Sequence, residues 1–366
     1  MKPLYKNSLI ASLIILVAGI VLFAIDLRDQ AGPALIFGLL ILSIGLRGHE
    51  FFKGFSYTTL ILAAVVASLY YPSYFTQIGS FKLSLLIVPL LQIIMFGMGT
   101  AMSLSDFMGV IKMPKAVGIG ILCQFTIMPL VGFSIALMFA FPPEIAAGIV
   151  LIGASPSGLA SNVMSYLAKA NLALSVTLTA CATLIAPLAT PFLMKHLAGQ
   201  FVPIEFWSMM WSIIKIVIIP IVAGLLFNHF FHGKFKWLDK AMPVVSMAGI
   251  ALIITIITAA GRESLLTIGI ALFAAAIIHN LTGYFLGYWA CRIFKMSEQD
   301  CRTIALEVGM QNGGLASGIA LEMGKVATVG LAPAIFGPWM NISGSSLATW
   351  WREKPTETEA EVESES

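Results

Sequence analysis

The chain has 366 residues, of which 58% are hydrophobic and 11% are charged, and its formal net charge is +3. Soluble domains carry about 25% charged residues, so this composition excludes a soluble globular protein. A mean hydropathy of +0.93 indicates a polytopic membrane protein. The basic residues are scattered over loops, which argues against a nucleic-acid partner. The four cysteines have no metal-type spacing, so we expect reduced packing residues.

Apolar runs long enough to cross a bilayer recur along the whole chain. The first begins at Ser8 and lacks a signal-peptide cleavage pattern, so we expect it to be a retained span. The second is the least distinct, because it is short and begins at Gly32-Pro33. We predict twelve spans, at residues 8–26, 32–47, 56–72, 82–103, 115–139, 145–168, 171–196, 207–229, 238–260, 264–291, 299–322 and 326–350.

The distribution of basic residues predicts the orientation. Fifteen Lys and Arg residues fall on one side of the predicted spans and five on the other. The positive-inside rule therefore predicts that both termini are cytoplasmic. Residues 353–366 contain six glutamates and almost nothing apolar, so we predict a disordered cytoplasmic tail.

An internal repeat is visible at an offset of 156 residues. The sequence Gly-Leu-Ala-Ser at 158–161 recurs at 314–317, and at the same offset Gln124 corresponds to Asn280. Five predicted spans lie in each half, 56–196 and 207–350. An odd number of spans inverts the second half relative to the first, which is typical of secondary transporters.

Two predicted spans are interrupted at matching places in the repeat. Pro156 and Gly158 interrupt the sixth span, and 309–314, which is rich in Gly, Gln and Asn, interrupts the eleventh. Irregular backbone at membrane depth is tolerated only where it is buried in protein or lines a wet cavity. Free carbonyls at such breaks suit cations, and free N–H groups suit anions. The breaks therefore indicate a binding site.

Glu307 lies beside the second break, with apolar sequence on both sides. A carboxylate at mid-span costs roughly 2.5–3.5 kcal/mol, so it is a functional candidate. A hard monovalent cation needs about five or six oxygen ligands. The polar residues within the spans supply carboxylate, amide and hydroxyl oxygens, and they are Gln124, Ser161, Asn162, Ser175, Thr179, Glu307, Gln311 and Asn312. Sodium coupling and proton coupling both fit this chemistry, and the amide and hydroxyl oxygens favour sodium.

Two further polar residues have open roles. Lys215 lies within a span, where its side chain either extends toward an interface or faces the cavity and attracts an anion. His279 stands beside Asn280, and we expect a hydrogen-bonded structural residue rather than a proton relay.

Several stretches resemble the bile acid:sodium symporter family in its bacterial form. The most specific are Ser161-Asn162 and Glu-Val-Gly-Met-Gln-Asn at 307–312, and their order and spacing also fit. The resemblance covers about residues 55–352 and is carried by 120–129, 158–175, 279–284, 307–316 and 341–349.

The resemblance implies an all-α polytopic protein of a bacterial inner membrane, with two inverted five-helix repeats forming panel and core domains and two broken helices crossing in the core. It implies two sodium sites. The first would use Ser161, Asn162, Ser175, Thr179 and Glu307. The second would use Gln124, Glu307, Gln311 and the carbonyls of Val308 and Met310. The implied substrate is a small organic anion beside the crossover, where we expect contacts from Ser157, Leu159, Asn312, Met340 and Asn341.

This chain departs from the family in two respects. Ser155-Pro156-Ser157-Gly158 replaces the more usual Cys-Pro-Gly-Gly, which changes the floor of the expected cavity. Residues 1–54 add two predicted spans of unassigned role. We therefore predict an N-terminal extension (1–54), a transporter unit (55–352, with repeats 55–200 and 206–352) and the tail (353–366). The oligomeric state stays open.

The favoured function is sodium-coupled symport of an organic anion, either bile-acid-like or a smaller carboxylate or sulfonate, by alternating access. The alternatives are a proton-coupled or export carrier of the same superfamily and a membrane sensor. An arsenite carrier would be expected to place a thiol at the crossover, where this chain has Ala154-Ser155. No paired carboxylates, His-Glu-x-x-His or Ser/His pair at one depth supports an enzyme.

Overall fold

The computed structural model describes residues 2–49, 52–231 and 234–355. Within them the chain is helical apart from turns, loops and a hairpin of two residues per strand, β1 (Gln77–Ile78) and β2 (Phe81–Lys82). The predicted all-α class is confirmed. Residues 356–366, most of the predicted disordered tail, lie outside the described part.

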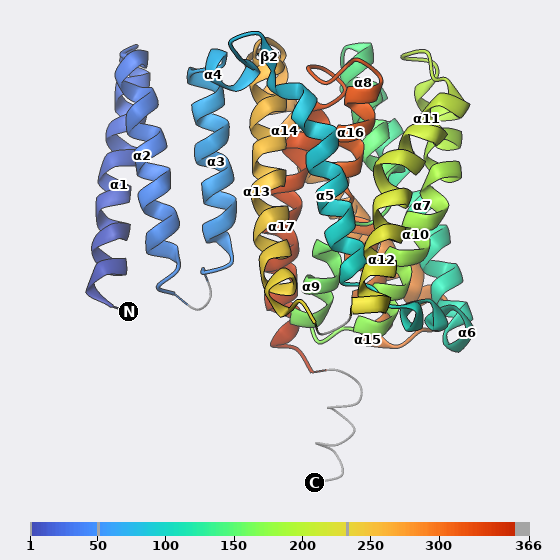
Figure 1. The fold of residues 1–366 in the computed structure, drawn as a ribbon. Helices are drawn as coiled ribbons and strands as arrows, with labels where there is room; N and C mark the ends of the chain where they lie inside the picture. Colours follow the sequence, from blue (N-terminus) through green and yellow to red (C-terminus); the bar gives the residue numbers. More distant parts are fainter. Residues whose placement is uncertain (1, 50–51, 232–233, 356–366) are drawn as a thin grey trace. The chain divides into compact units, whose positions relative to one another are not determined.

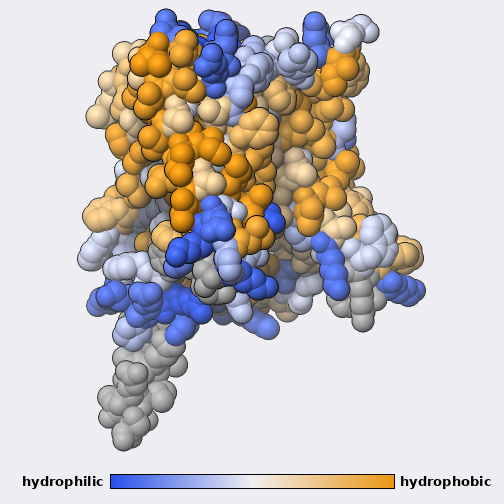
Figure 2. Space-filling model, turned by 90° about the vertical axis from the view of Figure 1, so that its left-hand side faces the viewer, coloured by the Kyte–Doolittle hydropathy of each residue, from blue (hydrophilic) through white to orange (hydrophobic). Residues whose placement is uncertain are grey.

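Eight helices among the described residues are long and apolar enough to cross a membrane. The remaining predicted spans coincide with the 16-residue α3, with α17, and with two pairs of shorter helices, α8–α9 and α15–α16, each separated by a break. On the face drawn in Figure 2, apolar residues gather in the middle and hydrophilic residues gather at the helix ends. The molecule is thus a polytopic membrane protein.

The chain divides into two compact units, Met1–Leu85 with Ala251–Thr267, and Leu86–Ile250 with Ile268–Ser366. The first contains α1 (Pro3–Ala24), α2 (Arg28–Leu46), α3 (Phe55–Tyr70), α4 (Ser73–Thr76) and the hairpin. This division groups α3 with α1 and α2. The boundary after residue 54 and those of the two repeats stay predictions.

Close approach holds α1 and α2 together in the first unit (Figure 1). A Cβ at Gly38 would lie 2.8 Å from Leu16 Cδ2, so the missing side chain lets the helices touch. The Ser56 hydroxyl, on α3, donates to the Ser43 carbonyl of α2 at 2.7 Å. Small residues at close helix contacts are typical of membrane helices.

The second unit is a helical bundle. Its elements in chain order are α5 (Ile87–Thr100), η2 (Leu104–Met108), α6 (Gly109–Lys112), α7 (Pro114–Met138), α8 (Pro143–Ala154), α9 (Ala160–Leu167), α10 (Leu172–Leu193), η3 (Met194–Ala198), α11 (Phe206–Ile213), η4 (Ile214–Ile218), α12 (Ile219–Phe231), α13 (Lys236–Ala260), α14 (Arg262–Ile293), α15 (Glu298–Gly309), α16 (Gly313–Glu322) and α17 (Leu331–Arg352). The short 3-10 turn η1 (Leu83–Leu86) precedes α5, and the last residues of α13 and the first of α14 belong to the first unit.

The first halves of the two broken helices, α8 and α15, are almost completely buried in this bundle. Every residue of α8 from Ile145 to Ala154 and of α15 from Cys301 to Gly309 is buried. Figure 1 shows α8 and α16 toward one end of the unit and α9 and α15 toward the other. The breaks therefore lie between the ends of the helices, enclosed by protein, as irregular backbone in a membrane requires.

Candidate functional site

The two breaks pair with each other through their backbones. Ser157 and Gln311 form an antiparallel bridge. The Gly158 N–H donates to the Met310 carbonyl at 3.1 Å, and the Asn312 N–H donates to the Pro156 carbonyl at 2.8 Å. The crossing of the two breaks thus satisfies backbone groups that the interrupted helices leave free.

Side-chain amides from neighbouring helices satisfy further carbonyls. Gln124 on α7 donates to the Ser155 carbonyl at 2.9 Å, where α8 ends. Asn280 on α14 donates to the Gly309 carbonyl at 2.8 Å, where α15 ends. The two amides paired by the sequence offset thus each hold the end of one broken helix.

Glu307 lies in a cage of hydroxyl groups and is 2% exposed. Its Oε1 accepts from the Ser161 and Ser175 hydroxyls, both at 2.6 Å, and its Oε2 accepts from the Thr179 hydroxyl at 2.9 Å. Ser161 comes from α9, whereas Ser175 and Thr179 lie one turn apart on α10. The structure therefore brings together all five residues of the first predicted sodium site, since Asn162 also joins it.

Acceptor oxygens outnumber hydroxyl protons in this cage. Ser175 Oγ lies 2.8 Å and Thr179 Oγ1 lies 3.1 Å from Asn162 Oδ1, and both also contact Glu307. Ser161 Oγ contacts the Gly158 carbonyl at 2.7 Å as well as Glu307. Each hydroxyl carries one proton, so three protons face six acceptor contacts. A cation would match this surplus of oxygen lone pairs, so the residues fit a bound monovalent cation.

Hydrogen bonds join three members of the second predicted set, Gln124, Gln311 and the Val308 carbonyl, whereas Glu307 and the Met310 carbonyl contact other groups. Gln124 Nε2 donates to Gln311 Oε1 at 2.8 Å, and Gln311 Nε2 donates to the Val308 carbonyl at 2.6 Å. The buried Gln124 Oε1 has no hydrogen-bond partner among the described residues. A buried polar atom without a partner is costly, and a cation beside Gln124 would supply one. The Met310 carbonyl already accepts from Gly158.

The predicted substrate residues differ in their surroundings. Leu159 and Asn341 are partly exposed, and the side-chain amide of Asn341 has no hydrogen-bond partner among the described residues. Ser157 is buried. The Asn312 side chain accepts from the Leu315 N–H and caps α16, and Met340 Sδ accepts from the Gln311 N–H. Asn312 and Met340 thus also stabilise the second break.

Sequence reasoning missed two polar residues next to Asn280, Tyr284 and Ser343. Ser343 donates to Asn280 Oδ1 at 2.5 Å, and the Tyr284 hydroxyl lies 3.2 Å from Ser343 Oγ. Tyr284 also packs on the second break, since a Cβ at Gly309 would lie 2.2 Å from Tyr284 Cδ1. Asn280 and Tyr284 are four residues apart and therefore lie on one face of α14, a spacing that could have indicated Tyr284 from the sequence.

Arg302 is a buried arginine that the sequence analysis did not single out. Its side chain is 2% exposed and lies within α15. The guanidinium donates to Glu298 at 2.9 Å and to the carbonyls at the ends of two helices, Ala168 after α9 at 3.3 Å and Trp351 in α17 at 3.1 Å. Arg302 therefore ties together the helices that carry Ser161 and Glu307.

The two residues with open roles are now placed. His279 is buried, and its Nε2 lies 3.0 Å from the Met128 carbonyl, which confirms the expected hydrogen bond. Lys215 is exposed in η4, a π-helical turn, and its own carbonyl accepts from Gln92 Nε2 at 3.3 Å.

Comparison with known proteins gives the family. Residues 88–268 match the model of the sodium bile acid symporter family. The chain is 40% identical over 316 residues to an uncharacterized sodium-dependent transporter, YocS, of Bacillus subtilis, covering 86% of this chain and 96% of that protein.

More distant relatives are transporters as well. The chain is 33% identical over 262 residues to the probable chloroplastic sodium/metabolite cotransporter BASS1 of Arabidopsis thaliana, covering 72% of this chain and 65% of that protein. It is 35% identical over 257 residues to the ileal sodium/bile acid cotransporter of Cricetulus griseus, covering 68% and 72%. The similarity to transporters, and not to enzymes, extends over most of the chain, and the chain belongs to the sodium bile acid symporter family.

Proposed function

We propose that the protein is a sodium-coupled symporter that moves an organic anion across the bacterial inner membrane by alternating access. The observation that carries this proposal is the surplus of acceptor oxygens around the buried Glu307. Sodium-dependent transport in the family supports sodium as the cation.

The first sodium ion is proposed to bind among the carboxylate of Glu307, the hydroxyls of Ser161, Ser175 and Thr179, and the amide oxygen of Asn162. When the ion enters, the hydroxyl protons turn outward and the oxygen lone pairs face the cation. Because Ser161 and Asn162 belong to α9 and Glu307 belongs to α15, the ion draws the two broken helices together.

The second ion is proposed to use Gln124, Gln311, Glu307 and the carbonyls of Val308 and Met310. The unpartnered Gln124 Oε1 supports this assignment. The Gln311 side chain also adjoins the bridge to Ser157, so an ion there would stabilise the backbone crossing.

The substrate anion is proposed to bind next to the crossover, where Leu159 and Asn341 are partly exposed. The Asn341 amide is a donor with no partner among the described residues. Binding of sodium would hold the crossover in the geometry that accepts the anion, and movement of the core helices against the panel helices would carry both across. Both termini are proposed to face the cytoplasm, as the basic residues predict.

A flux assay tests this proposal. The purified protein, reconstituted in liposomes, should accumulate a labelled organic anion when an inward sodium gradient is imposed and should not do so with potassium. Candidate anions are first selected by thermal shift in the presence of sodium. Accumulation driven by a proton gradient in sodium-free buffer would instead support the proton-coupled alternative, and no binding of sodium would overturn the proposal.

A further inference from the structure

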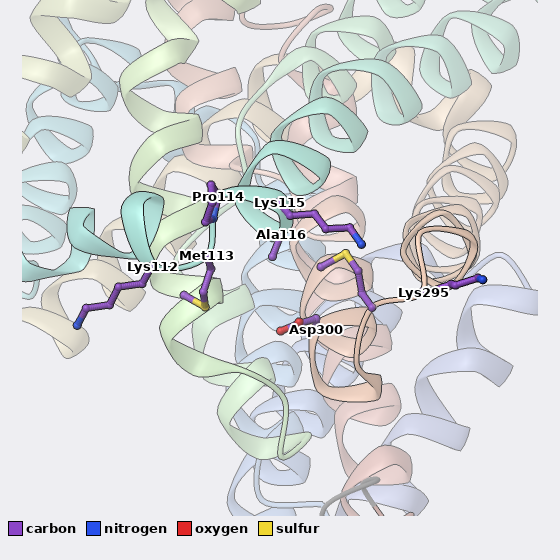
Figure 3. Close-up of a pocket in the computed structure, with 8 residues that line it drawn as sticks. Lys112, Met113, Pro114, Lys115, Ala116, Lys295 and Asp300 are labelled. Atoms are coloured by element: carbon purple, nitrogen blue, oxygen red, sulfur yellow. The ribbon is translucent and has the colours of Figure 1, made fainter.

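A pocket outside the crossover lies where the start of α7 meets the turn between α14 and α15 (Figure 3). Its volume is about 360 Å³, and its lining includes Lys112, Lys115 and Lys295 together with Met113, Met296 and Asp300. The second unit's α6 and the start of α15 lie toward the same end as the last turn of α17 (Figure 1). Neither the proposed sodium sites nor the proposed substrate site uses these side chains.

The lining is positively charged. The lining contains three lysines and one carboxylate, Asp300, whose Oδ1 already accepts from Asn171 Nδ2 at 2.8 Å. Lys115 Nζ donates to the Phe294 carbonyl at 2.9 Å, which leaves its charge unneutralised. Lys112 and Lys295 are exposed and have no acidic partner among the described residues. The pocket therefore attracts an anion.

The lysine side chains extend in different directions in Figure 3. Repulsion between like charges favours this arrangement. A lysine side chain has a flexible four-carbon stem and three donors, so the three ammonium groups can turn toward a shared anion whose charge offsets their repulsion.

The start of α7 adds backbone donors to the same pocket. The helix begins at Pro114 after Met113, and no side chain caps its first turn. The first N–H groups of a helix lack intrahelical partners and carry the positive end of the helix dipole. These groups favour a phosphate beside Lys115.

Large apolar side chains border the lysines and indicate which kind of phosphate fits. Ile111 precedes Lys112 and is 74% exposed. Ile293 and Phe294 precede Lys295 and are 76% and 47% exposed. Lysines beside exposed apolar residues at helix ends are typical of a membrane interface. A lipid satisfies both features, because its phosphate meets the lysines and its acyl chains cover the apolar residues.

We propose that this pocket binds the phosphate headgroup of an anionic phospholipid. The bound lipid would stabilise the start of α15 against α7. The hydrogen bond from Asn171 to Asp300 joins α15 to the beginning of α10, and Asn171 also caps α10 at the Leu174 N–H. Both α10 and α15 carry residues of the Glu307 cage, so lipid binding would restrict the movement of these two helices relative to each other.

Lipid binding is measured on the whole protein in nanodiscs or detergent, without a transport assay. Phosphatidylglycerol is titrated against a phosphatidylcholine background and followed by native mass spectrometry and thermal shift. The triple variant Lys112→Gln, Lys115→Gln, Lys295→Gln should bind phosphatidylglycerol about 10- to 100-fold more weakly, because each lysine near an anionic lipid surface contributes roughly fivefold.

The matched control makes the same change of charge elsewhere. Lys2→Gln, Lys6→Gln, Lys240→Gln alters three exposed lysines outside the pocket and should leave phosphatidylglycerol binding within about twofold of the wild type. An equal loss of phosphatidylglycerol binding in both triple variants would show a general attraction of the lipid to surface lysines and would overturn the proposal. Unchanged binding in the pocket variant would overturn it as well.

Two further arms complete the test. Asp300→Asn removes the repelling carboxylate, keeps a side-chain oxygen for Asn171, and should tighten phosphatidylglycerol binding severalfold, which checks the site even if the triple variant folds poorly. Inorganic phosphate should neither stabilise the protein in phosphatidylcholine nor displace phosphatidylglycerol at millimolar concentration. Stabilisation by inorganic phosphate alone would assign the pocket to a soluble anion and overturn the lipid proposal.

Discussion

The break between α8 and α9 and the break between α15 and α16 differ in what they contribute to one site. The first contains Pro156 and no charge, and its carbonyls accept from Gln124 and Asn312. The second contains no proline, follows Glu307, and begins the next helix with the Asn312 cap. The helix after the first break thus contributes only neutral oxygen atoms to the Glu307 cage, and the helix before the second break contributes the carboxylate.

The comparison shows that two breaks with paired backbones differ in the chemistry of the side chains around them. A second carboxylate in the first break would add charge repulsion and desolvation to a buried site. One carboxylate surrounded by hydroxyls and amides avoids that cost, and both breaks still close each other's backbone groups. Comparable substitutions near the two breaks should therefore change uptake and stability by different amounts.

The largest expected effect comes from the charge. Glu307→Ala should abolish sodium-dependent uptake in liposomes, because it removes the only carboxylate of the cage. Glu144→Gln is the matched control, since Glu144 lies in the first turn of the other broken helix and bonds to Lys325 and Thr328 at its partly exposed end. It should retain uptake. Wild-type uptake in Glu307→Ala would contradict the site.

Arg302→Met should be the most destabilising substitution. It leaves Glu298 and the carbonyls of Ala168 and Trp351 without their buried donor. Removing one member of a buried ion pair costs about 3–5 kcal/mol, which a lowered melting temperature in detergent would reveal. Arg292→Met removes a half-exposed partner of the same Glu298 and should cost less than about 1 kcal/mol. Equal losses of stability in the two variants would contradict the proposal that Arg302 holds α9, α15 and α17 together.

Glycine substitutions test the packing of the second break. A Cβ at Gly309 would lie 2.2 Å from Tyr284 Cδ1, whereas a Cβ at Gly337 would meet nothing within 4 Å. Gly309→Ala should lower stability by about 1–3 kcal/mol through overpacking, and Gly337→Ala should leave the melting temperature unchanged. A stable Gly309→Ala protein would mean that Tyr284 moves aside freely.

The smallest and most selective effect is expected from Gln124 and Asn280, whose substitutions should change different properties. Gln124→Ala removes the unpartnered oxygen beside the second proposed sodium site, and we expect the sodium concentration for half-maximal uptake to rise about tenfold. Asn280→Ala removes the bonds to Gly309 and Ser343 and should lower the melting temperature with little change in sodium dependence. Identical sodium titrations for Gln124→Ala and the wild type would argue against the second site.

The crossover shows how far sequence reasoning reaches. Costly polar residues in apolar spans located Glu307, Ser161 and Gln124, because each is conspicuous in its own segment. The interrupted spans likewise marked both breaks. Arg302 escaped notice, since an arginine near a span end has the same local sequence whether it faces water or packs against the carbonyl ends of two other helices.

The sequence by itself determined the membrane class, the order of the spans, the two breaks and the family, because hydropathy, proline and short motifs act locally. Only the tertiary structure decided which partners meet. The Ser161 hydroxyl reaches Glu307 across 146 residues, and Gln124 reaches Gln311 across 187. Such contacts form only after the helices pack, since burial and hydrogen bonding of the backbone break on one helix depend on the side chains of another.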